Sequence, residues 1–92
     1  MDNSELGAIV FSKSGRDSGR YFVVCKVLSE DYVMIVDGDL RRLAKPKLKK
    51  AKHLKLTGER LDNIATKFAE GKQVFDSEIR SAVRKYMEKI GG

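Results

Sequence analysis

The chain has 92 residues, of which 41% are hydrophobic and 35% charged, and its formal net charge is +6. That length suits one compact domain with a small core, so a deep enclosed active site is not expected. A small basic domain is more often a binder of polyanions than an enzyme.

Several other classes are disfavoured. No apolar run approaches the ~20 residues of a membrane span, and the polar start of the chain, residues 1–5, does not resemble a secretory signal. Cys25 is the one cysteine, so no intrachain disulfide can form, and a reducing, cytoplasmic setting is expected. One cysteine and one histidine cannot assemble a zinc site of the usual kind, so we expect neither a metal nor a cofactor.

The first part of the chain predicts short strands joined by tight turns. Residues 14–19 hold two glycines between Ser and Asp residues, which is typical of a turn, and Asp37-Gly38 favours a hairpin. Strands at intervals of about ten residues, with no room for crossover helices, predict a small antiparallel barrel or sandwich. The expected strands are residues 6–13, 20–28, 32–36, 40–43 and 53–56.

The second expected strand is apolar on both faces, which requires cover on the outer side of the sheet. Its alternation puts Tyr21, Val23, Cys25 and Val27 on one face and Phe22, Val24 and Leu28 on the other. The last third of the chain predicts two covering helices, the first capped by Thr57 and ending at Gly71, the second capped by Asp76. Apolar residues recur at helical spacing in both. Their stripes are Leu61, Ile64, Ala65 and Phe68, then Ile79, Val83, Tyr86, Met87 and Ile90.

The predicted fold is therefore mainly β with α. A small antiparallel barrel of about five strands occupies residues 1–56, with a basic loop at 41–55, and a two-helix extension at 57–92 packs on it as one compact domain.

The chain offers little for catalysis. Ser18 lies between glycines, but the only histidine is His53, and no nucleophile–base pair can be drawn. Asp37 and Asp39 suit a turn and lack the ligand ladder of a calcium loop. Cys25 is interpreted as a small buried hydrophobe. We therefore expect no enzyme activity and no small-molecule substrate.

Positive charge is concentrated before residue 57. Residues 1–56 hold 12 basic and 7 acidic residues, whereas residues 57–92 hold 7 and 6. The 41–55 segment has no acid and eight basic residues, namely Arg41, Arg42, Lys45, Lys47, Lys49, Lys50, Lys52 and Lys55. Two interpretations stay open at this point: a loop that follows a phosphate backbone, or a solvated edge kept soluble by lysine.

His53 lies inside this segment. Lys52 and Lys55 beside it disfavour its protonation, so it suits stacking or hydrogen bonding better than a pH switch. Contact with RNA and simple filling of a strand position are both open for it.

Residues 6–24 resemble a KOW motif. Gly7 matches the opening of the motif, Gly19 its fixed glycine, and residues 21–24 its apolar strand. The following pattern resembles one branch of the family, the class-fourteen proteins of the archaeal and eukaryotic large ribosomal subunit and their small bacterial KOW-domain RNA-binding relatives. That pattern comprises residues 36–39, Arg41-Arg42, 45–47 and 52–54.

The resemblance covers residues 5–56 and implies an SH3-like barrel with RNA as partner. It places RNA contacts on the first turn, at Lys13, Ser14, Arg16 and Arg20, and on Arg41, Arg42 and the lysines from 45 to 55. Ribosomal RNA is the favoured ligand, and the large ribosomal subunit is the particle it implies.

The first hypothesis is therefore a non-catalytic module that binds structured RNA. Only 8% of residues are aromatic, which favours recognition by shape and backbone over stacking on single strands. The alternatives are a protein-interaction module of the transcription or translation machinery, and a duplex-DNA-binding SH3-like barrel.

Overall fold

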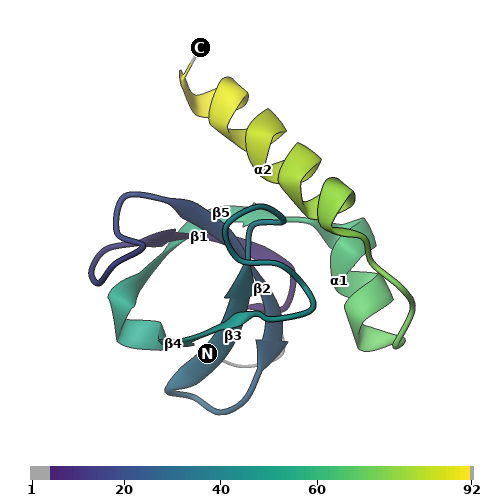
Figure 1. Cartoon of the computed structure of the whole chain (residues 1–92), viewed down its shortest axis with the longest axis horizontal. Helices are drawn as coiled ribbons and strands as arrows, with labels where there is room; N and C mark the ends of the chain where they lie inside the picture. The colour runs from purple at the N-terminus through teal and green to yellow at the C-terminus, as the bar shows by residue number, and fades with distance from the viewer. Residues whose placement is uncertain (1–4, 92) are drawn as a thin grey trace.

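Five strands form a single antiparallel sheet, and two helices follow them in the chain (Figure 1). The computed structural model describes residues 5–91, so most of the polar start, on which the expectation about a secretory signal depends, lies outside the described residues. Sheet order is β4-β3-β2-β1-β5. The elements are β1 Ala8–Ser12, β2 Tyr21–Val27, β3 Tyr32–Val36, β4 Lys47–Lys50, the 3-10 turn η2 Ala51–His53, β5 Leu54–Arg60, α1 Asp62–Ala69 and α2 Asp76–Gly91.

The predicted class, with about five antiparallel strands and two helices after them, is confirmed, but the sheet is not a closed barrel. The sheet curls, and β4 and β5 are its two edges, with no ladder between them among residues 5–91 (Figure 1). The short η2 turn carries the chain from one edge to the other. The amide of Ala51 donates to the carbonyl of Asp31 at 2.7 Å, which anchors this turn to the β2–β3 connection.

The fourth strand lies later in the chain than predicted. The expected strand at 40–43 does not form, and β4 begins at Lys47. Asp37 explains the difference, because its Oδ1 accepts the amides of Asp39 at 3.0 Å and Arg41 at 2.8 Å. These bonds draw the chain into a compact loop instead of a returning strand. The segment 41–55, expected to be one loop, therefore contains β4, η2 and the start of β5.

The first helix also begins later than predicted, after residue 61. Thr57 does not cap it, because its hydroxyl donates to the carbonyl of Ile9 at 2.7 Å and accepts the amide of Glu59 at 3.2 Å. The register between β1 and β5 shifts here, from the Val10–Leu56 pair to the Ala8–Arg60 pair. The polar pattern that resembles a helix cap therefore builds an irregularity in β5.

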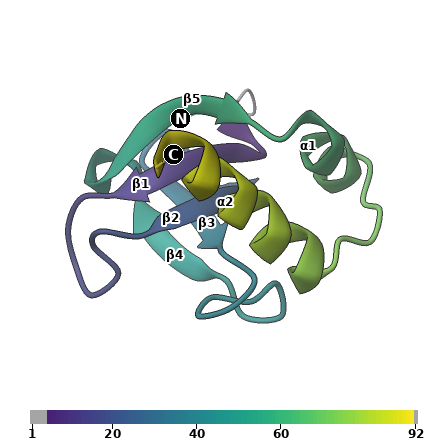
Figure 2. The same ribbon diagram turned by 90° about the horizontal axis from the view of Figure 1, so that it is seen from above.

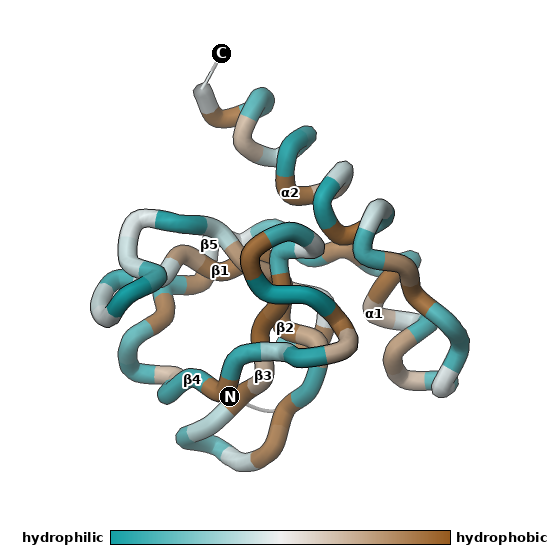
Figure 3. The backbone as a smooth tube through the Cα atoms, in the orientation of Figure 1, coloured by the Kyte–Doolittle hydropathy of each residue, from teal (hydrophilic) through white to brown (hydrophobic). Residues whose placement is uncertain are grey.

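β2 is buried on both faces, as predicted. Its residues are mostly hydrophobic (brown in Figure 3). Val23 belongs to the core under the helices, while Phe22 belongs to the core inside the curled sheet. The register shifts at Cys25, where Val24 pairs with Ile35 and Lys26 with Met34. This bulge ends the simple alternation, so Val27 packs on the side of Phe22 and not on the side predicted for it.

The helices cover the outer face of the sheet. α2 lies across the strands, with α1 beside it (Figure 2). Ile64 of α1 and Ile79 and Val83 of α2 pack against Ile9 and Val23 of the sheet, which confirms the first stripe and the first part of the second as core packing. The prediction is wrong for Met87 and Ile90, which do not belong to this core. The last turns of α2 extend beyond the sheet (Figure 1), and Met87 and Ile90 there are about half exposed.

Three contacts tie the 37–45 loop to the start of α2. Asp76 Oδ1 accepts the amide of Leu43 at 2.8 Å, so this carboxylate links the loop to the helix. Arg80 donates to the carbonyl of Gly38 at 2.9 Å. Gly38 has φ +78°, and a Cβ there would overlap the carbonyl oxygen of Asp76 and lie 2.8 Å from the amide nitrogen of Arg80. The loop and α2 are therefore in direct backbone contact at Gly38.

We expect Gly38→Ala to destabilise the fold more than Gly19→Ala. Both positions have positive φ, but a Cβ at Gly19 meets nothing within 4 Å. Backbone strain alone should lower the free energy of unfolding of Gly19→Ala by about 1–2 kcal/mol. The clash with α2 should cost Gly38→Ala about 1–3 kcal/mol more. Urea unfolding followed by circular dichroism measures both, and equal losses would contradict the contact.

Candidate nucleic-acid interface

The two basic segments found in the sequence lie together in the fold. The end of β1 pairs with the start of β5, with Phe11 opposite Lys55 and Ser12 opposite Leu54. The amide of Lys13 donates to the carbonyl of His53 at 2.8 Å. The β1–β2 turn, residues 13–20, therefore runs beside η2 and the adjoining strands.

Lys49 is a buried lysine that links the two basic segments by a hydrogen bond. It pairs with Val33 across β3 and β4, is only 8% exposed, and its Nζ donates to the carbonyl of Ser14 at 2.8 Å. Ser14 is half-buried, and its hydroxyl has no hydrogen-bond partner among the described residues. Lys49 thus holds the β1–β2 turn against β4, unlike the exposed Lys50 that follows it.

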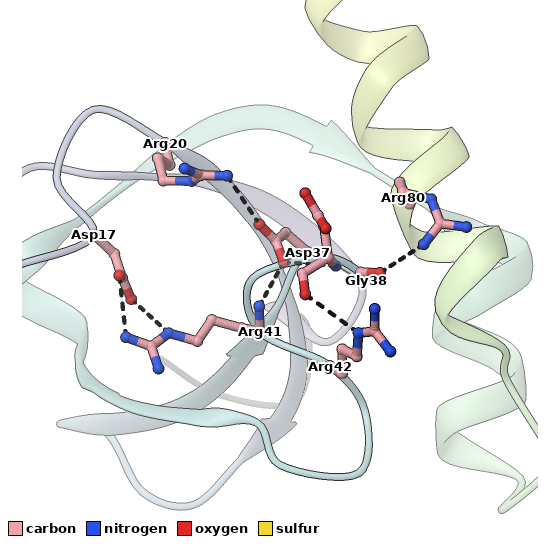
Figure 4. A network of polar contacts seen from close by, with 8 residues as sticks. Asp17, Arg20, Asp37, Gly38, Arg41, Arg42 and Arg80 are labelled. Atoms are coloured by element: carbon pink, nitrogen blue, oxygen red, sulfur yellow. Dashed lines mark hydrogen bonds and ion pairs between the residues drawn. The ribbon is translucent and has the colours of Figure 1, made fainter.

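Arg41 and Asp17 form the best-defined ion pair of the region (Figure 4). Arg41 donates to both carboxylate oxygens, Nε to Oδ2 at 2.9 Å and Nη2 to Oδ1 at 3.1 Å. The carboxylate is 3% exposed and the guanidinium side chain 28%. The hydrogen bonds from Arg41, together with the positive charges of Arg41, Lys49 and Lys47, lower the pKa of Asp17 and outweigh the opposite effect of burial.

Two further arginines predicted as RNA contacts are engaged with the 37–45 loop. Arg20 lies 3.7 Å from Asp37, which is itself almost fully buried. Arg42 donates to the carbonyl of Asp39 at 3.3 Å (Figure 4). Both side chains remain largely exposed on their outer sides, so they border the region without being free of protein partners.

Within the two basic segments, seven side chains have neither an ion pair nor a side-chain hydrogen bond to the described part of the chain, and we call them the basic strip. Apart from half-buried Lys47 they are exposed, and they follow the β1–β2 turn, the end of the 37–45 loop, β4, η2 and the start of β5. The Nζ of Lys50 lies over the ring of Tyr32, 6.0 Å from its centroid. The strip consists of Lys13, Arg16, Lys45, Lys47, Lys50, Lys52 and Lys55.

His53 lies within this positive potential. Partial desolvation lowers its pKa first, and the charges of nearby lysines lower it further. The predicted direction is therefore confirmed, and so is the contribution of Lys52, but Lys55, the other lysine expected to act on it, is not among the contributing charges. The contributing lysines come from both basic segments, namely Lys52, Lys49, Lys50 and Lys13.

Other chemistry-bearing residues are structural. Burial raises the pKa of the Cys25 thiol to about 11, and its Sγ donates to the carbonyl of Met34 at 3.4 Å, so it is not a thiolate nucleophile at neutral pH. Across residues 5–91, no three His, Cys, Asp or Glu side chains are grouped to hold a metal ion. Neither described helix has the length and apolar composition needed to cross a membrane.

The role of the two buried carboxylates was missed from the sequence. Asp17 and Asp37 looked like turn residues, yet they pair with Arg41 and Arg20 from other segments. A count of acids within 41–55 cannot reveal them, because Asp17 lies 24 positions before its partner. The available signal was only that Asp17 lies in a turn rich in glycine and positive charge.

No protein-family model matches the chain, and a search of curated proteins finds no match either. The KOW resemblance and the ribosomal branch therefore stay predictions from the sequence.

We expect Asp17→Asn to lower the free energy of unfolding by about 1–3 kcal/mol at pH 7, because Arg41 loses two charge-assisted hydrogen bonds. Since the folded-state pKa of Asp17 is lowered, this contribution is present above its ordinary value of 3.8 and is lost as pH falls through the folded-state pKa. The difference in free energy of unfolding between wild type and Asp17→Asn should thus become smaller below about pH 4.

Urea unfolding at a series of pH values measures this difference. Glu70→Gln is the matched control, because it removes an exposed pair with Lys72 and should change the free energy of unfolding by less than about 0.5 kcal/mol. An Asp17→Asn variant as stable as wild type at neutral pH would contradict a structural role for the pair.

Proposed function

We propose that this protein is a non-catalytic RNA-binding module that contacts structured RNA through the basic strip. One observation carries the proposal: the fold brings two basic segments together and leaves seven of their cations with neither an ion pair nor a side-chain hydrogen bond within residues 5–91. Unpaired lysines on a small basic domain are the usual means of binding phosphates. The alternative interpretation, that the lysines only keep the protein soluble, does not require the two basic segments to lie together.

Structured RNA fits this surface better than a stretched single strand. The strip follows the edge strand β4, the start of the edge strand β5 and the turns beside them, so its cations are spread along the rim of the sheet. Recognition of RNA helices depends on phosphate and 2′-hydroxyl contacts and on shape. Lysine contacts of this kind supply affinity with little base specificity.

The KOW resemblance extends the proposal to a more specific partner. It favours ribosomal RNA, a place on or near the large ribosomal subunit, and a cytoplasmic location. Co-sedimentation of the protein with ribosomal subunits in a lysate tests this finer statement separately from RNA binding itself.

A protein-interaction module is the second candidate, and one observation favours it. The last turns of α2 carry Met87 and Ile90, which are about half exposed. Co-sedimentation with RNA polymerase, lost in Ile90→Glu and kept when the strip lysines are removed, would support this candidate over the first.

We expect the affinity for an RNA hairpin to fall steeply with salt, and a triple variant to flatten that dependence. Replacing Lys47, Lys50 and Lys52 with Gln should reduce the slope of log K against log salt by about two to three, roughly one for each lost phosphate contact. Lys49 is kept, because its burial and its bond to Ser14 make it part of the fold. Fluorescence anisotropy across a salt series measures the slope.

The control variant removes the same charge from elsewhere. Replacing Lys72, Lys85 and Lys89, which lie on the α1–α2 connection and on α2, should leave the slope unchanged. Equal slopes for the two triple variants, or no binding at low salt, would contradict the proposal. Competition by duplex DNA as strong as by the RNA hairpin would favour the duplex-DNA alternative.

We expect RNA binding to raise the pKa of His53. In the free protein the surrounding lysines lower it, and bound phosphates neutralise those lysines. Binding to the hairpin should therefore become tighter as pH falls from about 8 towards the ordinary histidine pKa of 6.5. Proton NMR titration of the single histidine, with and without the hairpin, measures the shift; an unchanged pKa in the complex would place the RNA away from His53.

A further inference from the structure

The sheet presents a row of three side chains on its outer face where the helices no longer cover it. Phe11 of β1 lies opposite Tyr21 of β2 and opposite Lys55 of β5, so the three follow one another across adjacent strands. Residues opposite each other on paired strands share a face. Lys13 is two residues beyond Phe11, although it lies just past the end of the strand.

α2 supplies a wall beside this row. The ring of Tyr86 meets Tyr21 edge to face, with centroids 5.4 Å apart, and Tyr21 meets Phe11 at 5.1 Å. Three of the seven aromatic residues of the chain thus form a continuous chain of ring contacts. In the sequence, each of them occupies a position that suggests burial in the core. All three are only half-buried, so parts of their rings face solvent.

These rings line a hollow of about 390 Å³ between the sheet and α2. That volume is within the ~300–1,000 Å³ range of small-ligand sites. Its lining combines aromatic and aliphatic surface with two cations and no acid. The lining residues are Phe11, Lys13, Tyr21, Lys55, Leu56, Thr57 and Tyr86.

The lack of a carboxylate distinguishes this hollow from the other large ones. The hollow lined by Arg20, Arg80 and Arg84 also contains Asp37, Asp39 and Glu88, and the one between the helices contains Asp62 and Glu78. Acidic side chains in such places oppose a phosphate-bearing ligand. Only the aromatic hollow combines ring faces with a net positive lining among these three.

The hollow is also continuous with the basic strip. Lys13 and Lys55 belong to both, and the charge of Lys13 is felt at His53. Negatively charged groups on either side of a ligand in the hollow would therefore lie close to the lysines of the strip. Thr57 cannot serve as a free polar contact, because its hydroxyl is used by Ile9 and Glu59.

We propose that the hollow holds one unpaired nucleobase of the bound RNA, stacked against the aromatic rings, while Lys13 and Lys55 contact the phosphates on its two sides. The proposal rests on the proposed RNA-binding function and makes it more specific: the preferred RNA is a helix interrupted by a bulge or a single unpaired base. Aromatic side chains bind unpaired bases by stacking with little dependence on sequence. The strip then follows the paired part of the same RNA.

The test compares two RNA hairpins that differ only in one bulged 2-aminopurine. Wild-type protein should bind the bulged hairpin roughly five- to hundredfold more tightly than the fully paired one, which is the usual effect of stacking one base. The fluorescence of 2-aminopurine should fall on binding as the base stacks. Tyr86→Leu should remove most of this preference and of the quenching, and leave the affinity for the paired hairpin within about twofold.

Two further variants keep the test decisive. Phe11→Leu removes a ring from the opposite side of the hollow and serves if Tyr86→Leu fails to fold by circular dichroism. Tyr32→Leu is the matched control, because Tyr32 is an exposed tyrosine beside Lys50, outside the hollow. Loss of the preference in Tyr32→Leu but not in the hollow variants would overturn the assignment.

The outcomes also separate the two proposals. Equal affinity of wild type for the two hairpins, with the salt dependence intact, would overturn the base pocket and leave the RNA-binding function standing. Failure to bind either hairpin at low salt would overturn both.

Discussion

The structure depends on β2, a central strand that is apolar on both faces. Phe22 and Val23 are both fully buried, on opposite sides of the sheet, so each face needs its own cover. The curled sheet encloses one side, and α1 and α2 pack on the other. Because both faces are occupied, exposed charge is left to the edges, the turns and the outer helix surfaces. The basic strip lies along the edge strand β4 and the turns around it.

Two buried carboxylates then decide which cations remain available to a ligand. Asp17 binds Arg41 through both oxygens, and Asp37 lies near Arg20 while shaping its own loop. These arginines hold the β1–β2 turn and the 37–45 loop in place. The lysines of the basic strip, with flexible stems and no carboxylate partners within residues 5–91, are the side chains that we propose as phosphate contacts. The rigid part of the surface is thus built from arginine and aspartate, and the adaptable part from lysine.

If the surface binds RNA as proposed, the aromatic residues change the kind of RNA that suits it. Because they are few and scattered in the sequence, they predict recognition of RNA by its shape and backbone. Strand pairing brings Phe11 beside Tyr21, and helix packing adds Tyr86. The resulting hollow lies where the basic strip ends at Lys13 and Lys55. The two proposals, a paired helix along the strip and one base in the hollow, are therefore compatible parts of a single RNA ligand.

The sequence by itself determined the features that depend on local periodicity: the first three strands, the apolar stripe of α1 and the first part of that of α2, and the concentration of charge before residue 57. It misplaced the fourth strand and the start of α1, because Asp37 and Thr57 have side-chain oxygens whose partners cannot be read from neighbouring residues. Thr57 bonds to a carbonyl 48 positions away, and its local pattern equally suits a helix cap. The pairing of Arg41 with Asp17, the burial of Lys49 and the aromatic hollow were likewise decided only by tertiary structure. Each of these needs residues distant in the chain to meet, and hydrogen-bonding and packing energies act on spatial distance, not on separation along the sequence.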